Sequence, residues 1–286
     1  MHLPFVGAEA VAAGTLTRGQ LRWRNSAVHR GVYLPNGAQL SVATNAAAAW
    51  LWTGRRGVIT GRAAAALHGA SWVDADTPIE VIAEHTRRRP GVRVYEERIA
   101  ADEICHIGDL PVTTPARTAL CIGRRLPRNT AVAHLDALAA ATGLTAVEII
   151  ELAQRYGGTR GIRRARTAVG LMDAGAQSPK ESWLRLALVD GGLPRPRTQI
   201  RVTDGRRTAF LDMGWEEPKV GLDYEGDHHR AQRSTYVSDI ARYAMIERLG
   251  WLDLRVVAEH STAFTINRVR EAFRQRNFTP TSASGL

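Results

Sequence analysis

The stretch DMGWEEPKVGLDYEGDHHR, residues Asp212–Arg230, places six carboxylates and two histidines within nineteen residues. The rest of the chain is basic: its 286 residues include 38 Lys and Arg against 28 Asp and Glu, a formal net charge of +10. Acids gathered so closely in a basic chain indicate a local purpose. The residues on either side predict the secondary structure that carries them.

Helix and strand signals place this stretch within a sheet. Ser178-Pro-Lys-Glu181 has the form of a capping box with proline at the first helical position, so a helix begins there. The apolar runs that follow predict three strands, a helix and a fourth strand, over residues 198–202, 208–213, 219–225, 236–249 and 251–258. The expected order of this region is αβββαβ.

Three acids of these strands are candidate metal ligands. Alternation along the third strand places Asp223 and Glu225 on one face, and Asp212 lies beside Asp223 if the second and third strands pair. Carboxylates about 4 Å apart repel by roughly 1–4 kcal/mol, depending on the dielectric, and a cation offsets this repulsion. Hard oxygen ligands suit Mg²⁺ or Mn²⁺, which polarise a phosphate and generate a hydroxide nucleophile. The alternative is that these acids are solvated surface residues of a two-sided strand.

The same motifs resemble the PD-(D/E)XK nuclease fold, which has the αβββαβ order. They are more closely similar to actinobacterial proteins with a C-terminal Vsr-like endonuclease domain of unknown function. The likeness covers residues 175–260 and rests on four motifs, SPKES at 178–182, FLDMGW at 210–215, VGLDYEGDHHR at 220–230 and ERLGW at 247–251. The resemblance implies a restriction-endonuclease-like α/β domain with metal-dependent deoxyribonuclease activity.

The resemblance also implies a role for each acid. Asp212, Asp223 and Glu225 are the implied metal ligands, and Glu181 in the first helix is an auxiliary catalytic acid. The capping box alone explains Glu181 equally well. His229 is the implied proton carrier, in a Vsr-like manner.

The chain departs from the family pattern in two ways. The family's Glu-x-Asp-Gly appears here with its acids exchanged, as Asp223-Tyr-Glu225-Gly, so a degenerate site is the alternative. The lysine of the wider superfamily is also replaced by Glu225. His228 is a second candidate for proton transfer, and Lys219 is a candidate electrostatic substitute. Arg242 is interpreted as the partner of an acid three residues before it on its own helix.

The first 42 residues predict a winged helix. Pro4–Ala13 can form a short helix, Thr17-Arg-Gly-Gln20 is a capping box that opens a second, and a β segment over Ala27–Leu34 with a turn at Pro35–Gly37 predicts a hairpin. Excess positive charge favours a polyanionic partner, DNA above all. The candidate DNA contacts are Arg18, Gln20, Arg22, Arg24 and Arg30. The alternative is a small helical domain with solvated arginines.

The middle of the chain, residues 43–174, reads as a further α+β region, so the N-terminal half is α+β. Its GDLPVTTPART, with LTRGQLR and VHRGVYLP before it, resembles AbiEi-type antitoxins of type IV toxin–antitoxin systems. This resemblance implies the alternative function, a non-catalytic transcriptional regulator, and leaves a toxin partner or a homodimer open. We expect a domain boundary near Gly175, a nuclease-like domain over 175–278 and a disordered tail over 279–286.

Other features of the sequence concern membrane association and cellular location. The longest apolar run, Ala46–Trp52, is far shorter than the roughly 20 residues that a membrane span needs. The N-terminus lacks the basic segment of a signal peptide, and Cys105 and Cys121 match no disulfide or metal pattern. We therefore expect a cytoplasmic protein without membrane contact.

Overall fold

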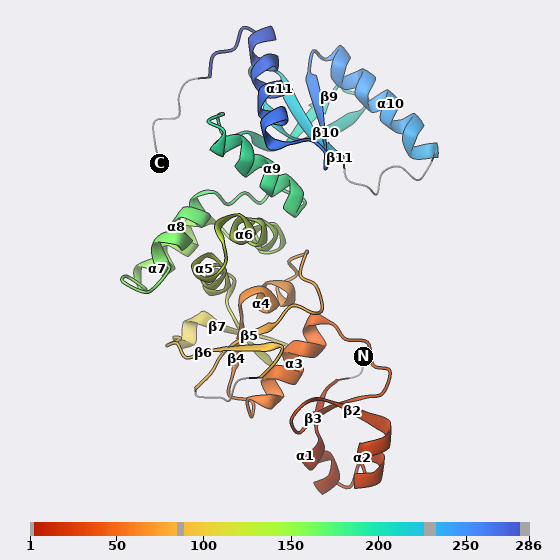
Figure 1. Cartoon of the computed structure of the whole chain (residues 1–286), viewed down its shortest axis with the longest axis vertical. Coiled ribbons are helices and arrows are strands. Elements are labelled where there is room, and N and C mark those ends of the chain that lie inside the picture. The colour runs from red at the N-terminus through yellow and green to blue at the C-terminus, as the bar shows by residue number, and fades with distance from the viewer. Residues whose placement is uncertain (1–2, 85–88, 226–232, 281–286) are drawn as a thin grey trace. The chain divides into compact units, whose positions relative to one another are not determined.

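The computed structural model describes residues 3–84, 89–225 and 233–280, with the backbone alone for 233–239 (Figure 1). The chain divides into two compact units, Met1–Ala174 and Gly175–Leu286, which are described separately. Both units mix helices and strands, so the mixed α and β composition expected from the sequence is confirmed. In the part of the chain that the structure describes, no helix is long and apolar enough to cross a membrane.

The first unit begins with two helices and a small sheet. Thr17 caps α2 (Arg18–Arg24), and its backbone N–H is bound in return by Gln20. The remaining elements are β1 (Phe5–Val6), α1 (Gly7–Ala12), β2 (Asn25–His29) and β3 (Val32–Pro35), with strand order β1-β3-β2.

The hairpin of this sheet turns earlier than the sequence suggested. The predicted single β segment is two paired strands, and the connection between them is Arg30-Gly31 rather than Pro35–Gly37. Gly31 has a φ of +81°, a conformation that glycine adopts without steric cost. Arg30 therefore lies at the tip of the hairpin.

The middle of the first unit is built on a five-stranded sheet in the order β6-β5-β4-β8-β7. Its strands are β4 (Val58–Thr60), β5 (Ile79–Ile82), β6 (Val92–Tyr95), β7 (Ile104–Ile107) and β8 (Leu110–Thr113). Its helices are α3 (Val42–Trp52), α4 (Gly61–Leu67), α5 (Pro115–Arg125), α6 (Arg128–Thr142), α7 (Ala146–Gln154) and α8 (Ile162–Gly170), with the short η1 (Ala101–Glu103) before β7. Alanines of α3 and α4 pack closely on the sheet, which explains the alanine-rich sequence.

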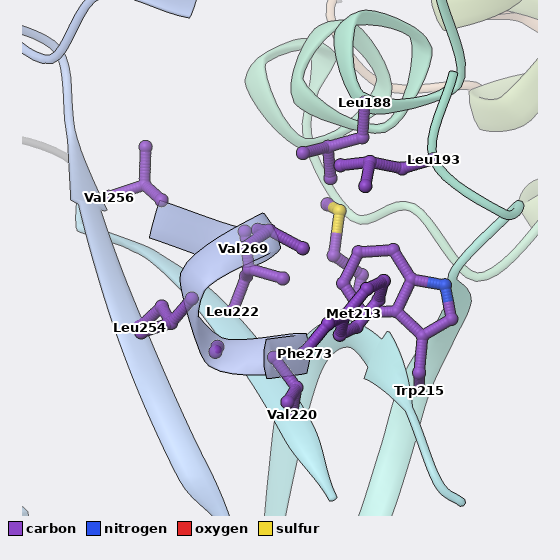
Figure 2. Packing of buried hydrophobic residues seen from close by; sticks show 11 residues of the cluster. Leu188, Leu193, Met213, Trp215, Val220, Leu222, Leu254, Val256, Val269 and Phe273 are labelled. Carbon is purple, nitrogen blue, oxygen red and sulfur yellow. The ribbon is translucent and has the colours of Figure 1, made fainter. Parts of the chain in front are cut away.

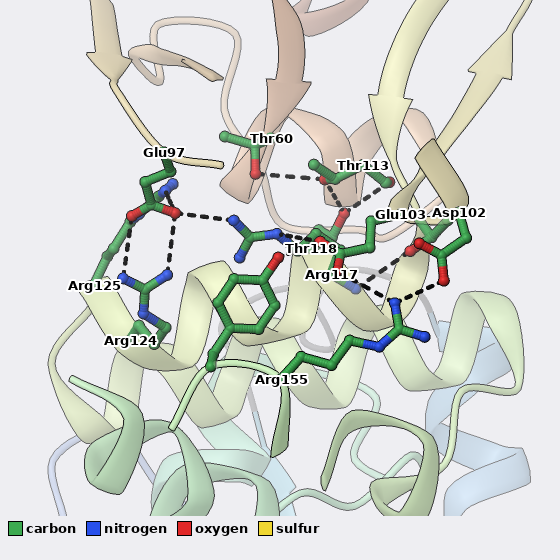
Figure 3. Close-up of polar contacts among 12 residues, drawn as sticks. Thr60, Glu97, Asp102, Glu103, Thr113, Arg117, Thr118, Arg124, Arg125 and Arg155 are labelled. Carbon is green, nitrogen blue, oxygen red and sulfur yellow. Dashed lines mark hydrogen bonds and ion pairs between the residues drawn. The ribbon is translucent and has the colours of Figure 1, made fainter. Parts of the chain in front are cut away.

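A network of ion pairs fixes α5 beneath this sheet (Figure 3). The Glu97 carboxylate contacts Arg117 at 2.9 Å, Arg124 at 3.1 Å and Arg125 at 3.2 Å. Arg117 also contacts Glu103 at 3.1 Å. Burial works to raise the pKa of Glu97, but the Arg124 hydrogen bond and the neighbouring guanidinium charges outweigh it and hold this pKa at about 2.

The second unit carries the acidic stretch on a four-stranded sheet of order β12-β11-β10-β9. Its elements are α9 (Pro179–Asp190), β9 (Arg197–Thr203), β10 (Thr208–Trp215), β11 (Val220–Glu225), α10 (Arg233–Arg248), β12 (Leu252–Val257) and α11 (Thr262–Gln275). The sequence analysis did not anticipate α11. Apart from it, the elements occur in the order αβββαβ.

Two cores cover opposite faces of this sheet. Leu188 of α9 and Phe273 of α11 pack on Met213 and Leu222 of the sheet (Figure 2). Met245 and Ile246 of α10 pack instead on Leu211 and its neighbours, including Ile200 and Ala209. Leu211 and Met213 are two residues apart and would lie on the same face of a regular strand, but they pack on opposite faces of this sheet. The alternation of side chains along β10 is therefore interrupted at Asp212.

Candidate functional site

The acids gather where β10 and β11 separate. The ladder between these strands ends at the pair Met213↔Leu222. Beyond it, side chains replace backbone partners: the Asp212 N–H donates to Asp223 Oδ1 at 3.0 Å, and the Tyr224 N–H donates to Asp212 Oδ2 at 2.7 Å. The two carboxylates therefore lie side by side between diverging strands, as the sequence predicted if the strands paired.

Glu181 joins them from the first turn of α9. Ser178 caps this helix by accepting the Glu181 N–H at 3.2 Å. The Glu181 carboxylate accepts in return from Ser178 Oγ and from the Gln177 N–H, both at 2.8 Å. Its pKa is raised by burial, against these hydrogen bonds, and the nearby charge of Asp223 raises it further. Capping thus occupies both oxygens of Glu181 while the side chain stays within electrostatic reach of the other acids.

The positive charge near Asp212 does not offset its burial and the neighbouring acids. Burial raises its pKa to about 7; the Tyr224 N–H opposes this rise, and the charges of Asp223 and Glu181 add to it. A carboxyl with such a pKa is only partly ionised at neutral pH. A divalent cation bound here would offset the repulsion, and the donor set is the hard oxygen type that Mg²⁺ and Mn²⁺ prefer. The acids therefore fit a metal ion in charge and in ligand chemistry.

Arg242 of α10 places a cation beside these acids, a role that the sequence analysis missed. Its Nη2 pairs with Asp223 Oδ2 and donates to the Phe210 carbonyl at 2.7 Å. The acid three residues before Arg242, Asp239, has its side chain outside the described residues, so the pairing expected within the helix stays a prediction, and the described ion pair of Arg242 reaches β11. Both oxygens of Asp223 are thus engaged by protein donors.

Glu225 lies at the end of β11 and is held to one side. Its Oε1 lies 3.4 Å from Arg255 Nε and accepts from the Tyr243 hydroxyl at 3.4 Å. The Arg255 guanidinium stacks at 3.5 Å over the Tyr243 ring, which fixes this arrangement. In this conformation Glu225 faces Arg255 and α10, and no contact joins it to Asp212 within the part of the chain that the structure describes.

A further acid, Asp253 of β12, was not predicted. Its register partner on β11 is Gly221, two residues before Asp223. Burial raises the Asp253 pKa to about 7, and the charge of Asp223 adds to this. Neither carboxylate oxygen has a hydrogen-bond partner among the described residues. The sequence signal for this residue is an acid in a mostly apolar strand.

Other predicted residues lie apart from the acids or outside the described residues. Lys219 Nζ donates to the Leu249 carbonyl at 3.0 Å, at the far end of β11 from Asp223, so it does not take the place of a catalytic lysine. His228 and His229 lie outside the described residues. Among the residues that are described, no group of three or more His, Cys, Asp or Glu side chains already has the arrangement of a metal site.

The predicted DNA contacts of the first unit are mostly exposed. No residue of α2 is buried. Exposed side chains on α2 and at the hairpin tip are Arg18, Arg22, Arg24 and Arg30, with Trp23 78% exposed among them. Gln20 is partly buried, and its Oε1 accepts the Thr17 N–H at 2.8 Å within the cap, so this oxygen is already engaged.

Comparison with known proteins adds relatives but no function. No family model matches the chain, and no solved structure matches it. Two uncharacterized proteins of Mycobacterium tuberculosis, from strains CDC 1551 / Oshkosh and H37Rv, are each 29% identical to it over 197 residues. The similarity covers 68% of this chain and 72% of each relative.

Proposed function

We propose that this is a cytoplasmic DNA-binding protein whose second unit is a metal-dependent endonuclease of the restriction-endonuclease-like type. The observation that carries the proposal is the meeting of Asp212, Asp223 and Glu181 where β10 and β11 separate. A buried Asp212 with a pKa of about 7 is the kind of strongly perturbed group that clusters at functional sites.

Each acid has a part in this proposal. Asp212 and Asp223 hold the metal, and Asp223 becomes available when Arg242 leaves its Oδ2. Glu181 fixes the start of α9 and adds negative charge beside them, and Glu225 is an auxiliary ligand that must first leave Arg255. A Mg²⁺ or Mn²⁺ ion held there would supply Lewis-acid chemistry toward the scissile phosphate and a water molecule. His229, four residues beyond Glu225 in the chain, remains the proposed proton carrier.

The first unit is proposed to bring DNA to the protein as a winged helix. Two helices followed by a hairpin, with exposed arginines on α2 and at the hairpin tip, support this assignment. Arg18, Arg22, Arg24 and Arg30 contact phosphates, which position the protein on the duplex without reading sequence. Gln20 is the remaining proposed contact, through its amide nitrogen.

A non-catalytic regulator is the second candidate, and one observation favours it. Arg242 neutralises Asp223 and the Asp212 N–H occupies its other oxygen, as expected for a nuclease-like fold that has lost its metal. In that case the winged helix binds operator DNA, as in an antitoxin-like repressor of a type IV system, and a toxin or a second copy is the partner.

A cleavage assay separates the two candidates. Wild type, Asp212→Asn and Glu217→Gln are incubated with supercoiled, linear, single-stranded and T·G-mismatched DNA in Mg²⁺, in Mn²⁺ or in EDTA. Glu217 is an exposed acid of the β10–β11 connection and serves as a matched control. The nuclease proposal expects metal-dependent cutting that only Asp212→Asn abolishes. DNA binding with no cutting of any substrate supports the regulator.

A further inference from the structure

One face of the β9–β10 hairpin is exposed beside the acids. Phe210 pairs in register with Arg201, and Thr208 with Thr203. Their neighbours in both strands point into the core beneath α10, so these four side chains share the opposite face. Phe210 is 50% exposed, and Arg201 and Thr208 are also exposed. We call Arg201, Thr203, Thr208 and Phe210 the hairpin face.

The β9–β10 hairpin that carries this face is basic. Arg206 and Arg207 lie at the turn and are exposed, as is Arg201 on the strand. Within the described residues, none of these three arginines forms a salt bridge, whereas the one acid of the turn, Asp204, pairs with Arg248 at 2.7 Å. The hairpin therefore carries an excess of positive charge, and Arg201 lies directly across from the exposed ring of Phe210.

The hairpin face lies near Asp212 and Glu181, whereas Asp223 lies on the side of the sheet that α10 covers. Phe210 precedes Asp212 by two residues, about 7 Å along a strand. Arg242 of α10 approaches from the other side of the sheet, where its Nη2 contacts the Phe210 carbonyl and Asp223. At the other strand, Gln199 Oε1 accepts from Gln177 Nε2 at 3.1 Å, which places the start of α9 and hence Glu181 next to β9.

We propose that the hairpin face binds a single-stranded or locally unpaired segment of nucleic acid and leads it to the acids, an inference that rests on the proposed nuclease function. Arginines track the phosphates of such a strand, and an exposed aromatic ring stacks on a base. The flat face of a base is covered by its neighbours in an intact duplex, so Phe210 selects a base that has left the stack. The substrate class of the site is therefore DNA with an unpaired segment.

Binding to the full chain tests this surface. Arg22→Ala and Arg24→Ala are present throughout, so that α2 contributes little, and EDTA prevents cutting. The probes are a fluorescein-labelled oligothymidylate and a duplex of the same length, followed by fluorescence anisotropy. Phe210→Ala should weaken binding of the oligothymidylate roughly 5- to 150-fold, the effect of about one stacked base, and change duplex binding little. Phe210→Trp should retain the affinity.

Two controls make the result specific. Phe264 on α11 is 48% exposed and has Arg268 over its ring, so Phe264→Ala is a matched substitution that should leave binding unchanged. Arg201→Gln should weaken both probes and lower the salt dependence of oligothymidylate binding by about 0.7 in slope. Equal losses for Phe210→Ala and Phe264→Ala, or equal losses on both probes, would overturn the inference.

Cleavage by the same proteins distinguishes this inference from the function on which it rests. If Asp212→Asn loses cutting but Phe210→Ala binds oligothymidylate as well as wild type does, the strand-binding role of the hairpin face is refuted and the nuclease function stands. Selective loss of binding in Phe210→Ala with no metal-dependent cutting by wild type refutes the nuclease and leaves a strand-binding surface.

Discussion

Replacing Asp212 with asparagine should change how the stability of the protein depends on pH. Burial raises the pKa of the folded carboxyl from 3.8 to about 7, with Asp223 and Glu181 adding to the rise despite the Tyr224 N–H. Between these two values the folded state holds a proton that the unfolded state has released. The free energy of unfolding must therefore fall as the pH rises through this window.

The size of the effect follows from the same pKa values. A rise from 3.8 to about 7 is about three units, which at 1.36 kcal/mol per unit is on the order of 4 kcal/mol. Asparagine has no proton to release, and its Oδ1 can still accept the Tyr224 N–H. The stability of Asp212→Asn relative to wild type should thus increase by on the order of 4 kcal/mol between about pH 4 and about pH 8 in the absence of metal.

Urea unfolding in EDTA at constant ionic strength measures this difference across the pH range. Glu217→Gln, in the exposed β10–β11 connection, should follow wild type at every pH. Adding Mn²⁺ at the upper end of the range should stabilise wild type but not Asp212→Asn, because bound metal offsets the repulsion among the acids. A stability difference between Asp212→Asn and wild type that stays constant with pH would refute this reasoning.

Three further predictions concern the cores and the first unit. Leu222→Ala removes a fully buried side chain and should lower the free energy of unfolding of the second unit by about 2–5 kcal/mol in urea titrations; a loss well below this range would contradict the packing in Figure 2. Although burial opposes it, the surrounding arginines hold the Glu97 pKa at about 2 instead of 4.5. Glu97→Gln should therefore lower the free energy of unfolding by about 3 kcal/mol above about pH 4.5, and this loss should vanish as the pH falls towards 2. An unfolding difference that does not change with pH would be at odds with this. Arg22→Ala and Arg24→Ala should each weaken duplex binding and reduce its salt slope by about 0.9, and an unaltered slope would remove α2 from the DNA surface.

Local signals in the sequence were sufficient for many elements. Thr17 and Ser178 start helices because a capping box needs only residues three positions apart, which the sequence displays directly. Alternating apolar residues in 198–202 and 219–225 likewise predicted strands. The neighbouring positions of Asp212 and Asp223 followed once their strands were assumed to pair.

Contacts between distant elements were not visible in the same way. Arg242 pairs with Asp223, nineteen residues earlier and on another element, so no local spacing marks it. Asp253 comes close to the acids only through parallel pairing of β12 with β11. Trp183 of α9 is 45% exposed, because helical periodicity turns it away from the face of the helix that is buried.

Binding of Mn²⁺, followed by electron paramagnetic resonance in the absence of DNA, tests most directly whether these acids form a metal site. Wild type should bind the ion at neutral pH and lose affinity as the pH falls below about 7, where protons compete for Asp212. Asp212→Asn should bind at least about tenfold more weakly, as expected for the loss of one charged ligand interaction of about 1.4 kcal/mol or more. Equal Mn²⁺ affinity in wild type and Asp212→Asn would contradict the proposed metal site.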